Sequence, residues 1–256
     1  MDPFQNSLYH FEEFNEQIFA QYDPQGLQNL SQVKRGHGDL DSLLHDVLRK
    51  KTPIHPLPYS LFKLQDEMNC ITRDIKYITG VLFYLRPYII DTDETNGRYN
   101  QNLADRRYLM YANFGLQSIY NFWDRIGDML HLYFETGLPV GNVYLGRVLN
   151  NIKPKDKLNQ YFIDLESLYD NELKGFIDER NNTVHHYQLE SQFYWGAIEQ
   201  HQNLSEKSRL NADKHAFPEK FKHHLELCFK GFELALLLLD TLPDDPNIPV
   251  QPYHSS

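Results

Sequence analysis

Apolar side chains recur every three or four positions along most of this chain, which is the spacing that gathers them on one face of an α-helix. The clearest run covers residues 103–136. Its apolar positions are Leu109, Ala112, Leu116, Ile119, Trp123, Ile126, Leu130 and Tyr133. Gly137 follows the run, and glycine is the residue type that most readily ends a helix. We therefore predict a long amphipathic helix here.

The same spacing predicts further helices on both sides of that run. They are expected at residues 4–22, 39–51, 59–90, 143–150, 158–189 and 218–242, with a weaker helical segment around residues 193–200. The first helix would carry Leu8, Phe11, Phe14, Ile18 and Phe19 on one face. Pro87 is expected to bend the end of the helix at 59–90, and a break is expected near Asp170 and Asn171. No segment shows the alternation of a strand, so the predicted fold class is all-α, a bundle of long helices.

Prolines divide the chain into three predicted parts. Pro53, Pro56 and Pro58 favour an extended connector, because proline cannot continue a helix. We expect a helical extension at residues 1–58 that packs on a bundle at residues 59–242. Residues 243–256 form a Pro-rich tail.

Composition and charge limit the kinds of function that fit the chain. Apolar residues make up 41% of the 256 positions, which is enough for a substantial core. The formal net charge is −10, which excludes a uniformly basic protein that coats nucleic acid, so an RNA contact would need a local positive patch. Cys70 and Cys228 stand outside any CxxC or Cys/His metal pattern and favour a reducing compartment.

The chain carries no pattern for membrane insertion or for a bound cofactor. The first residues lack a basic segment followed by an apolar run, and the longest apolar stretches are too short to cross a bilayer. We therefore expect a soluble cytoplasmic protein. No cofactor or metal is predicted, since nucleotide-binding glycine loops and metalloprotease motifs are absent from the sequence, and His223 and His224 diverge around a helix.

One predicted helix carries an unusual set of polar residues, in the stretch GFIDERNNTVHHYQLE at residues 175–190. Its apolar stripe runs through Leu173 and Ile177, and the next step along that stripe lands on Arg180. A buried guanidinium without a partner costs several kcal/mol, on the order of the penalty for a lone buried charge. Arg180 therefore needs either a carboxylate partner or a water-filled cleft.

Asn181 and His185, which lie close to Arg180 in the sequence, are candidates for further polar groups in such a cleft. Asn181 and His185 are four positions apart, so they share a helix face, and an amide beside an imidazole fixes its tautomer. Arg180 and His185 point about 140° apart on an ideal helix, yet long side chains can flank one pocket. The long helix supplies candidate partners in a polar stripe. That stripe consists of Gln117, Asn121, Asp124, Asp128 and His131.

The pattern Arg180-Asn-Asn-Thr-Val-His185 resembles the signature of the HEPN superfamily, in which an arginine precedes a histidine by several positions and a polar residue often follows the arginine. The predicted helical bundle is similar to that family's all-α fold. The stretch NFWDRIGDMLHLYF in the long helix also resembles the upstream helix of uncharacterised bacterial HEPN proteins.

The resemblance implies a metal-independent endoribonuclease that works as a homodimer. It implies that His185 transfers protons, that Arg180 holds the scissile phosphate and that Asn181 orients His185 or the phosphate. The ribose 2′-OH would be the nucleophile. It also implies a place in a toxin–antitoxin or defence system with an antitoxin-like partner protein. The alternative that it leaves open is a non-catalytic module that binds a nucleotide or a protein.

Simpler interpretations of the same residues remain open. Arg180 can instead form a salt bridge with Asp124 or Asp128 that ties two helices together, and His185 can be an ordinary surface histidine. In that case the bundle is structural and the motif a coincidence. The basic residues Lys153, Lys155 and Lys157 can steer an RNA backbone or be solvated helix ends. Tyr187, Phe193, Tyr194 and Trp195 can stack on a base, although core packing is the expectation for them.

Overall fold

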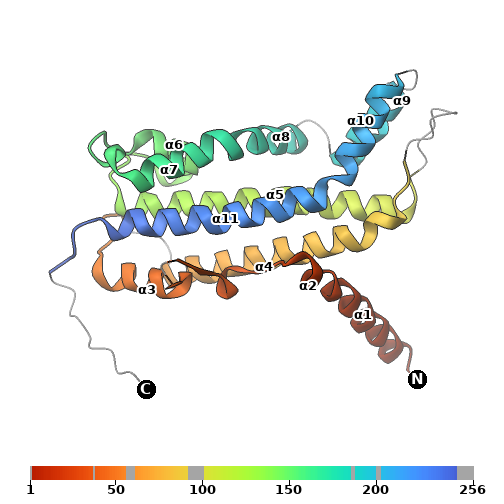
Figure 1. Ribbon diagram of the computed structural model, residues 1–256, viewed down its shortest axis with the longest axis horizontal. Helices are drawn as coiled ribbons and strands as arrows, with labels where there is room; N and C mark the ends of the chain where they lie inside the picture. The colour runs from red at the N-terminus through yellow and green to blue at the C-terminus, as the bar shows by residue number, and fades with distance from the viewer. Residues whose placement is uncertain are drawn as a thin grey trace. The chain divides into compact units, whose positions relative to one another are not determined.

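The computed structural model describes residues 2–36, 38–55, 61–91, 101–185, 188–199 and 203–246, and most of them are helical (Figure 1). The predicted all-α fold class is confirmed. In chain order the α-helices are α1 (Pro3–Ala20), α2 (Tyr22–Gln25), α3 (Leu40–Lys50), α4 (Leu61–Leu85), α5 (Leu103–Tyr133), α6 (Leu145–Asn151), α7 (Gln160–Leu168), α8 (Lys174–His185), α9 (Leu189–Glu199), α10 (Leu204–His215) and α11 (Phe217–Asp240).

Short elements connect or extend these helices. They are the 3₁₀ turns η1 (Leu30–Gln32), η2 (Arg86–Tyr88), η3 (Val140–Asn142) and η4 (Asp156–Leu158), and the π-helical segment η5 (Tyr169–Leu173). Two short strands, β1 (Lys34–Arg35) and β2 (Gly38–Asp39), pair antiparallel with Lys34 opposite Asp39. No strand was predicted there, because two residues are too few to show an alternating pattern.

Contacts divide the chain into two compact units, and each unit takes segments from distant parts of the sequence. The first unit contains residues 1–28, 72–119 and 177–225, and the second contains residues 29–71, 120–176 and 226–256. The predicted division at residues 1–58, 59–242 and 243–256 stays a prediction, and residues 56–60 and 247–256 lie outside the described part.

Aromatic rings fill the core of the first unit, where the end of α4 and the starts of α5 and α11 lie side by side (Figure 1). The ring of Phe217 packs against Tyr108, Phe193 and Phe221. Gly115 of α5 lets this packing close, because a Cβ at position 115 would overlap the ring of Phe221. A helix interior usually avoids glycine, so the close approach explains its presence.

The second unit has a core of its own around the later part of α5. Phe122 and Trp123 are buried and pack on the later part of α11, where Phe232 contacts Phe122. A Cβ at Gly231 would overlap the indole of Trp123. The backbone N–H groups of Ile54 and His55 donate to the carbonyl of Leu132, which fastens the segment after α3 to the end of α5.

Side-chain caps set several helix starts. Asp39 accepts from the backbone N–H of Asp41 at 2.9 Å and starts α3, which ends with Arg49 and Lys50 as the helix dipole favours. At the start of α5, the side chain of Asn102 accepts from the backbone N–H of Asp105 at 2.8 Å, and the Asp105 carboxylate accepts from the N–H of Asn102 at 3.1 Å. This reciprocal pair is a capping box.

The predicted break near Asp170 and Asn171 is a π-helical insertion rather than an end. The segment η5 joins α7 to α8 without a turn between them, so one extra residue is accommodated inside a continuous helix. At Pro87 the chain passes from α4 into the 3₁₀ turn η2, because proline has no N–H to continue the α-helical ladder.

Two predicted features of the helices need correction. The predicted apolar face of α1 is mostly exposed: Ile18 is buried and Phe14 half-buried, whereas Leu8, Phe11 and Phe19 face solvent. The later half of α1 packs on α4, where Tyr84 donates to Gln17 at 2.9 Å. The sequence did not predict α10, because the buried positions of α10 are Lys207 and Lys214 rather than an apolar stripe. No helix in the described residues is long and apolar enough to cross a membrane.

Candidate functional site

The first unit contains a pocket of about 650 Å³ that is walled by the first half of α5, the later part of α8 and the start of α9. Arg106 and Arg107 of α5 and Arg180 of α8 line it, together with Glu190 of α9. The apolar part of its lining comes from α5 and consists of Leu103, Met110, Phe114 and Leu116. The pocket therefore joins concentrated positive charge to an apolar wall.

Arg180 reaches this pocket from a half-buried position on α8. Its Nη2 donates to Oε1 of Gln117 on α5 at 2.6 Å, and its Nη1 donates to Oδ1 of Asn181 at 3.0 Å. Both acceptors are neutral amides, so they fix the direction of the guanidinium without cancelling its charge. This geometry brings Gln117, a member of the predicted polar stripe, to Arg180.

The carboxylates that were predicted to pair with Arg180 lie in the second unit, as does Asn121. Asp124 and Asn121 are half-buried. Asp128 accepts from Arg125 at 3.2 Å, and Arg125 also approaches Glu67 at 3.7 Å. The pairing of Arg180 with Asp124 or Asp128 therefore stays a prediction.

The other two residues of the motif are Asn181 and His185, and the structure describes the side chain of Asn181 alone of these two. Asn181 accepts a hydrogen bond from Arg180, and its predicted role in orienting His185 or the phosphate stays a prediction. His185 is the last residue of α8, and its side chain lies outside the described part of the chain. The expected contact between Asn181 and His185 stays a prediction.

The three lysines that were predicted to steer an RNA backbone belong to the second unit. Lys153 pairs with Glu135. Lys157 donates to the carbonyl of Asn150 at 3.2 Å and lies over the ring of Phe162. Lys155 is exposed. A role in steering RNA stays a prediction for these residues.

Sequence reasoning missed Arg106 and Arg107. Their signal was a basic doublet in the first turns of the longest helix, directly after a polar segment. Arg106 Nε lies 3.9 Å from a carboxylate oxygen of Glu190, and Arg107 Nη1 lies 3.9 Å from the sulfur of Met110. Basic residues at a helix start oppose the helix dipole, so their placement calls for another explanation.

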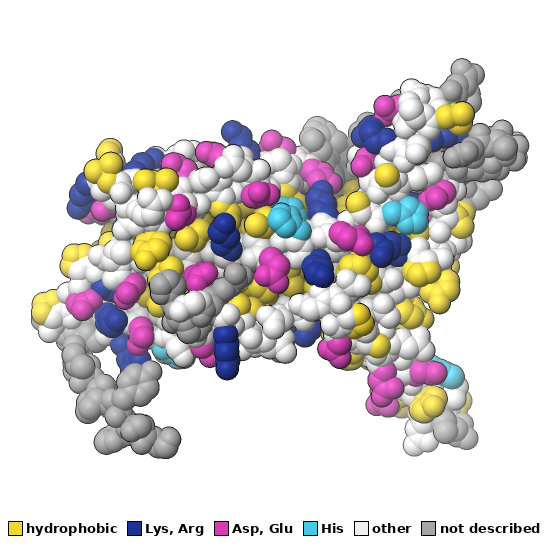
Figure 2. Space-filling view, viewed as in Figure 1, with side chains coloured by type: hydrophobic (Ala, Val, Ile, Leu, Met, Phe, Trp, Pro, Cys, Tyr) yellow, Lys and Arg dark blue, Asp and Glu magenta, His cyan; other side chains and the backbone are white. Residues whose placement is uncertain are grey.

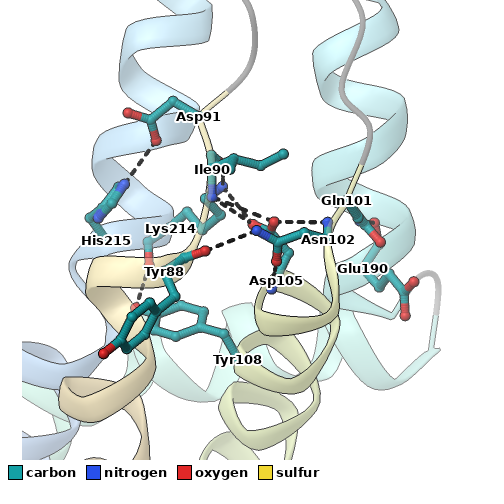
Figure 3. Close-up of polar contacts among 10 residues, drawn as sticks. All are labelled: Tyr88, Ile90, Asp91, Gln101, Asn102, Asp105, Tyr108, Glu190, Lys214 and His215. Carbon is teal, nitrogen blue, oxygen red and sulfur yellow. Dashed lines mark hydrogen bonds and ion pairs between the residues drawn. The ribbon is translucent and has the colours of Figure 1, made fainter.

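A buried ion pair holds the start of α5, which carries these two arginines (Figure 3). Asp105 is fully buried, and its carboxylate receives Lys214 Nζ of α10 at 3.2 Å. Lys214 Nζ also donates to the carbonyl of Ile90, and the backbone N–H of Ile90 donates back to Asp105 at 3.3 Å. Burial lowers the pKa of Lys214, and the charge of Asp105 opposes that effect.

Further hydrogen bonds extend this cluster toward both neighbouring segments (Figure 3). The hydroxyl of Tyr108 donates to the carbonyl of Lys214 at 2.7 Å, and His215 Nε2 lies 2.8 Å from Asp91. On the pocket side, the Gln101 amide donates to the carbonyl of Glu190 at 3.3 Å. The segment that follows η2, the start of α5, the start of α9 and the end of α10 are thus joined next to the arginine doublet.

The aromatic residues after the motif do not all pack in the core as expected. Phe193 is buried, but Tyr194 and Trp195 are 41% and 53% exposed, so the prediction was right for Phe193 and wrong for the other two. Tyr187 lies outside the described residues. Consecutive residues of a helix point in different directions, so on a partly covered helix one faces the core while its neighbours face solvent.

Charge over the rest of the surface is mixed. On the face drawn in Figure 2, Lys and Arg side chains are interspersed with Asp and Glu side chains.

Within the described residues, no group of three or more His, Cys, Asp or Glu side chains is arranged to hold a metal ion. Burial lowers the pKa of His224 to about 3, so this histidine is neutral at physiological pH.

Comparison with known proteins identifies one family. The profile of a family described as Cthe2314-like HEPN matches residues 57–240. The matched span contains every residue that lines the pocket, as well as Arg180, Asn181 and His185. No curated protein and no solved structure matches the chain significantly.

Proposed function

Because this chain belongs to the Cthe2314-like HEPN family, we propose that it is a metal-independent endoribonuclease that cuts RNA beside Arg180. The observation that carries the proposal is the position of Arg180. The arginine of the Arg-Asn-x3-His pattern lines an open pocket together with Arg106 and Arg107. Three guanidinium groups at one pocket suit a polyanionic substrate, because guanidinium binds phosphate oxygens in a bidentate manner.

The proposed reaction uses the RNA's own 2′-hydroxyl. Its oxygen attacks the adjacent phosphorus, the bond from phosphorus to the 5′-oxygen breaks, and the products are a 2′,3′-cyclic phosphate and a 5′-hydroxyl. One proton leaves the 2′-hydroxyl and one is delivered to the departing 5′-oxygen. His185 carries out this proton transfer, for which the ordinary pKa of histidine is well suited.

Arg180 stabilises the charge that grows on the phosphoryl oxygens during this displacement. Its hydrogen bonds to Gln117 and Asn181 hold the guanidinium in place before the substrate arrives. Groups that are oriented in advance stabilise a transition state without a cost of reorganisation at the moment of reaction. Gln117 and Asn181 are therefore positioning residues in this proposal.

The active form that we propose is a homodimer, in which two copies of the pattern face one cleft. A place in a toxin–antitoxin or defence system, with an antitoxin-like protein that controls the activity, belongs to the same proposal. Sedimentation of the purified protein measures the assembly directly, and a monomer at all concentrations would refute the dimer.

The test is cleavage of mixed RNA by purified protein in EDTA. We expect cleavage by the wild type without metal, products that end in a 2′,3′-cyclic phosphate, and loss of activity in His185→Ala and Arg180→Ala. Circular dichroism and thermal unfolding of each variant show whether it folds. Lys230→Ala removes an exposed basic residue of the second unit and serves as the matched control. A folded wild type that leaves RNA intact would refute the nuclease.

A second candidate function is a non-catalytic module that binds a nucleotide. The observation in its favour is the pocket itself, because about 650 Å³ falls within the range of small-molecule sites. The two candidates differ in a simple way. The module binds a nucleoside phosphate and leaves RNA uncut, whereas the nuclease produces cyclic phosphate ends.

A further inference from the structure

The pocket has two chemically different walls on one helix. Arg106 and Arg107 form the charged wall, and the apolar wall beside them is unusually open to solvent. Leu103 is 70% exposed and Phe114 is 53% exposed. Exposed large apolar side chains beside a charged cluster are typical of a ligand site rather than of an ordinary helix surface.

The spacing of the lining residues along α5 places charged and apolar side chains on the same face of the helix. Leu103, Arg107, Met110 and Phe114 follow steps of four, three and four residues, so they form one stripe on the helix. Arg107 and Phe114 are separated by about 10 Å along the helix axis, from the rise of 1.5 Å per residue. A nucleotide has a matching layout, with its phosphate at one end and at the other a flat aromatic base, whose face stacks on aromatic side chains.

The contacts that Arg106 and Arg107 make with other described side chains are weak. Arg106 faces Glu190 at 3.9 Å, and both side chains are largely exposed. Such pairs contribute little to stability, so a phosphate that offers bidentate hydrogen bonds can displace the carboxylate. Among the described residues, no carboxylate pairs with Arg107, which contacts the sulfur of Met110.

We propose that this pocket binds one unpaired nucleotide of an RNA strand, with Arg106 and Arg107 holding its phosphate and Phe114 stacking on its base. The inference rests on the proposed function in taking RNA as the ligand. Arg180 then holds the neighbouring, scissile phosphate, and Glu190 is a competing anion that the RNA displaces. A base that is paired within a duplex cannot reach Phe114, so the pocket selects single-stranded RNA.

Binding rather than cleavage tests this inference. A fluorescent single-stranded oligoribonucleotide is titrated into the full-length His185→Ala protein in EDTA, and anisotropy gives the affinity at several salt concentrations. We expect Arg106→Gln and Arg107→Gln each to weaken binding about tenfold and to reduce the salt slope by about 1. Phe114→Ala should weaken binding at least fivefold and leave the salt slope unchanged, because stacking releases no counterions.

Glu190→Gln gives the sharpest contrast, because removing a surface contact would not normally improve binding. We expect it to tighten binding severalfold, since it removes the anion that competes for Arg106. The matched controls are Arg209→Gln and Phe11→Ala, which remove an exposed arginine and an exposed aromatic residue outside this pocket. Neither control should change the affinity, and thermal unfolding of each variant confirms that it is folded.

A duplex of the same sequence and a free nucleoside 5′-monophosphate complete the comparison. Equal affinity for the single strand and the duplex would overturn the inference. A protein that binds the monophosphate but does not bind the oligonucleotide would overturn it too. Unchanged affinity in Arg106→Gln, Arg107→Gln and Phe114→Ala would overturn it as well.

The outcome separates this inference from the proposed function. Binding with the expected dependence, together with a wild type that leaves RNA uncut, would refute the nuclease and keep the pocket. Cleavage by the wild type with normal affinity in all pocket variants would refute the pocket and keep the nuclease.

Discussion

Replacement of Lys214 by Met is expected to destabilise the protein by about 3–5 kcal/mol, the usual cost of breaking a buried ion pair from one side. Methionine has a similar length and fills the same space, but it leaves the Asp105 carboxylate without its cation. The side chain of Asp105 is 0% exposed and that of Lys214 is 2% exposed, so water cannot replace the lost charge.

The surrounding hydrogen bonds place the expected loss near the lower end of that range. The backbone N–H groups of Ile90 and Asn102 still donate to Asp105 in Lys214→Met, at 3.3 and 3.1 Å in the native geometry. These donors offset part of the buried charge. The double variant Asp105→Asn/Lys214→Met carries no charge at this position. We therefore expect it to be more stable than Lys214→Met alone.

Urea unfolding followed by circular dichroism at pH 7 measures these differences, with linear extrapolation to zero urea. Lys50→Met is the control, because Lys50 is an exposed lysine that pairs with Asp240 at 3.6 Å and should lose less than about 0.5 kcal/mol. A loss below about 1 kcal/mol in Lys214→Met would refute the reasoning. So would a double variant that is less stable than the single one.

Three further predictions concern other parts of the molecule. Protonation of His224 is disfavoured in the folded state, where burial, Lys220 and His223 lower its pKa to about 3 from an ordinary 6.5. The wild type should therefore lose about 2 kcal/mol more than His224→Gln between pH 7 and pH 5 in urea unfolding, and equal losses would contradict this. Gly115→Ala should lower stability by about 1–3 kcal/mol, because the added Cβ overlaps the ring of Phe221. Gly175→Ala has open space around it and should raise stability by about 0.5–1 kcal/mol. Thermal unfolding measures both, and a shift of the two variants in the same direction would contradict the packing. Lys153→Ala should leave RNA affinity within about twofold of wild type, since this lysine is exposed and pairs with Glu135; a larger loss in anisotropy would instead assign it a role in steering RNA.

Local pattern was sufficient for most helices of this protein. The run at residues 103–136 corresponds to α5, and the run at 218–242 corresponds to α11 within a few residues. Apolar spacing is a property of neighbours in sequence, so it can be read without knowledge of the fold. Apolar spacing does not predict α10, because Lys207 and Lys214 occupy its buried positions and only distant partners make a buried lysine tolerable.

The candidate site shows the same division. The sequence by itself determined that Arg180 interrupts an apolar stripe and stands before Asn181 and His185 in a family pattern. Only the tertiary structure decided that Gln117 holds the guanidinium and that Arg106, Arg107 and Phe114 share its pocket. Gln117 and Arg180 are 63 positions apart. No local rule relates two residues at such a separation, because chain folding alone brings them within hydrogen-bond distance.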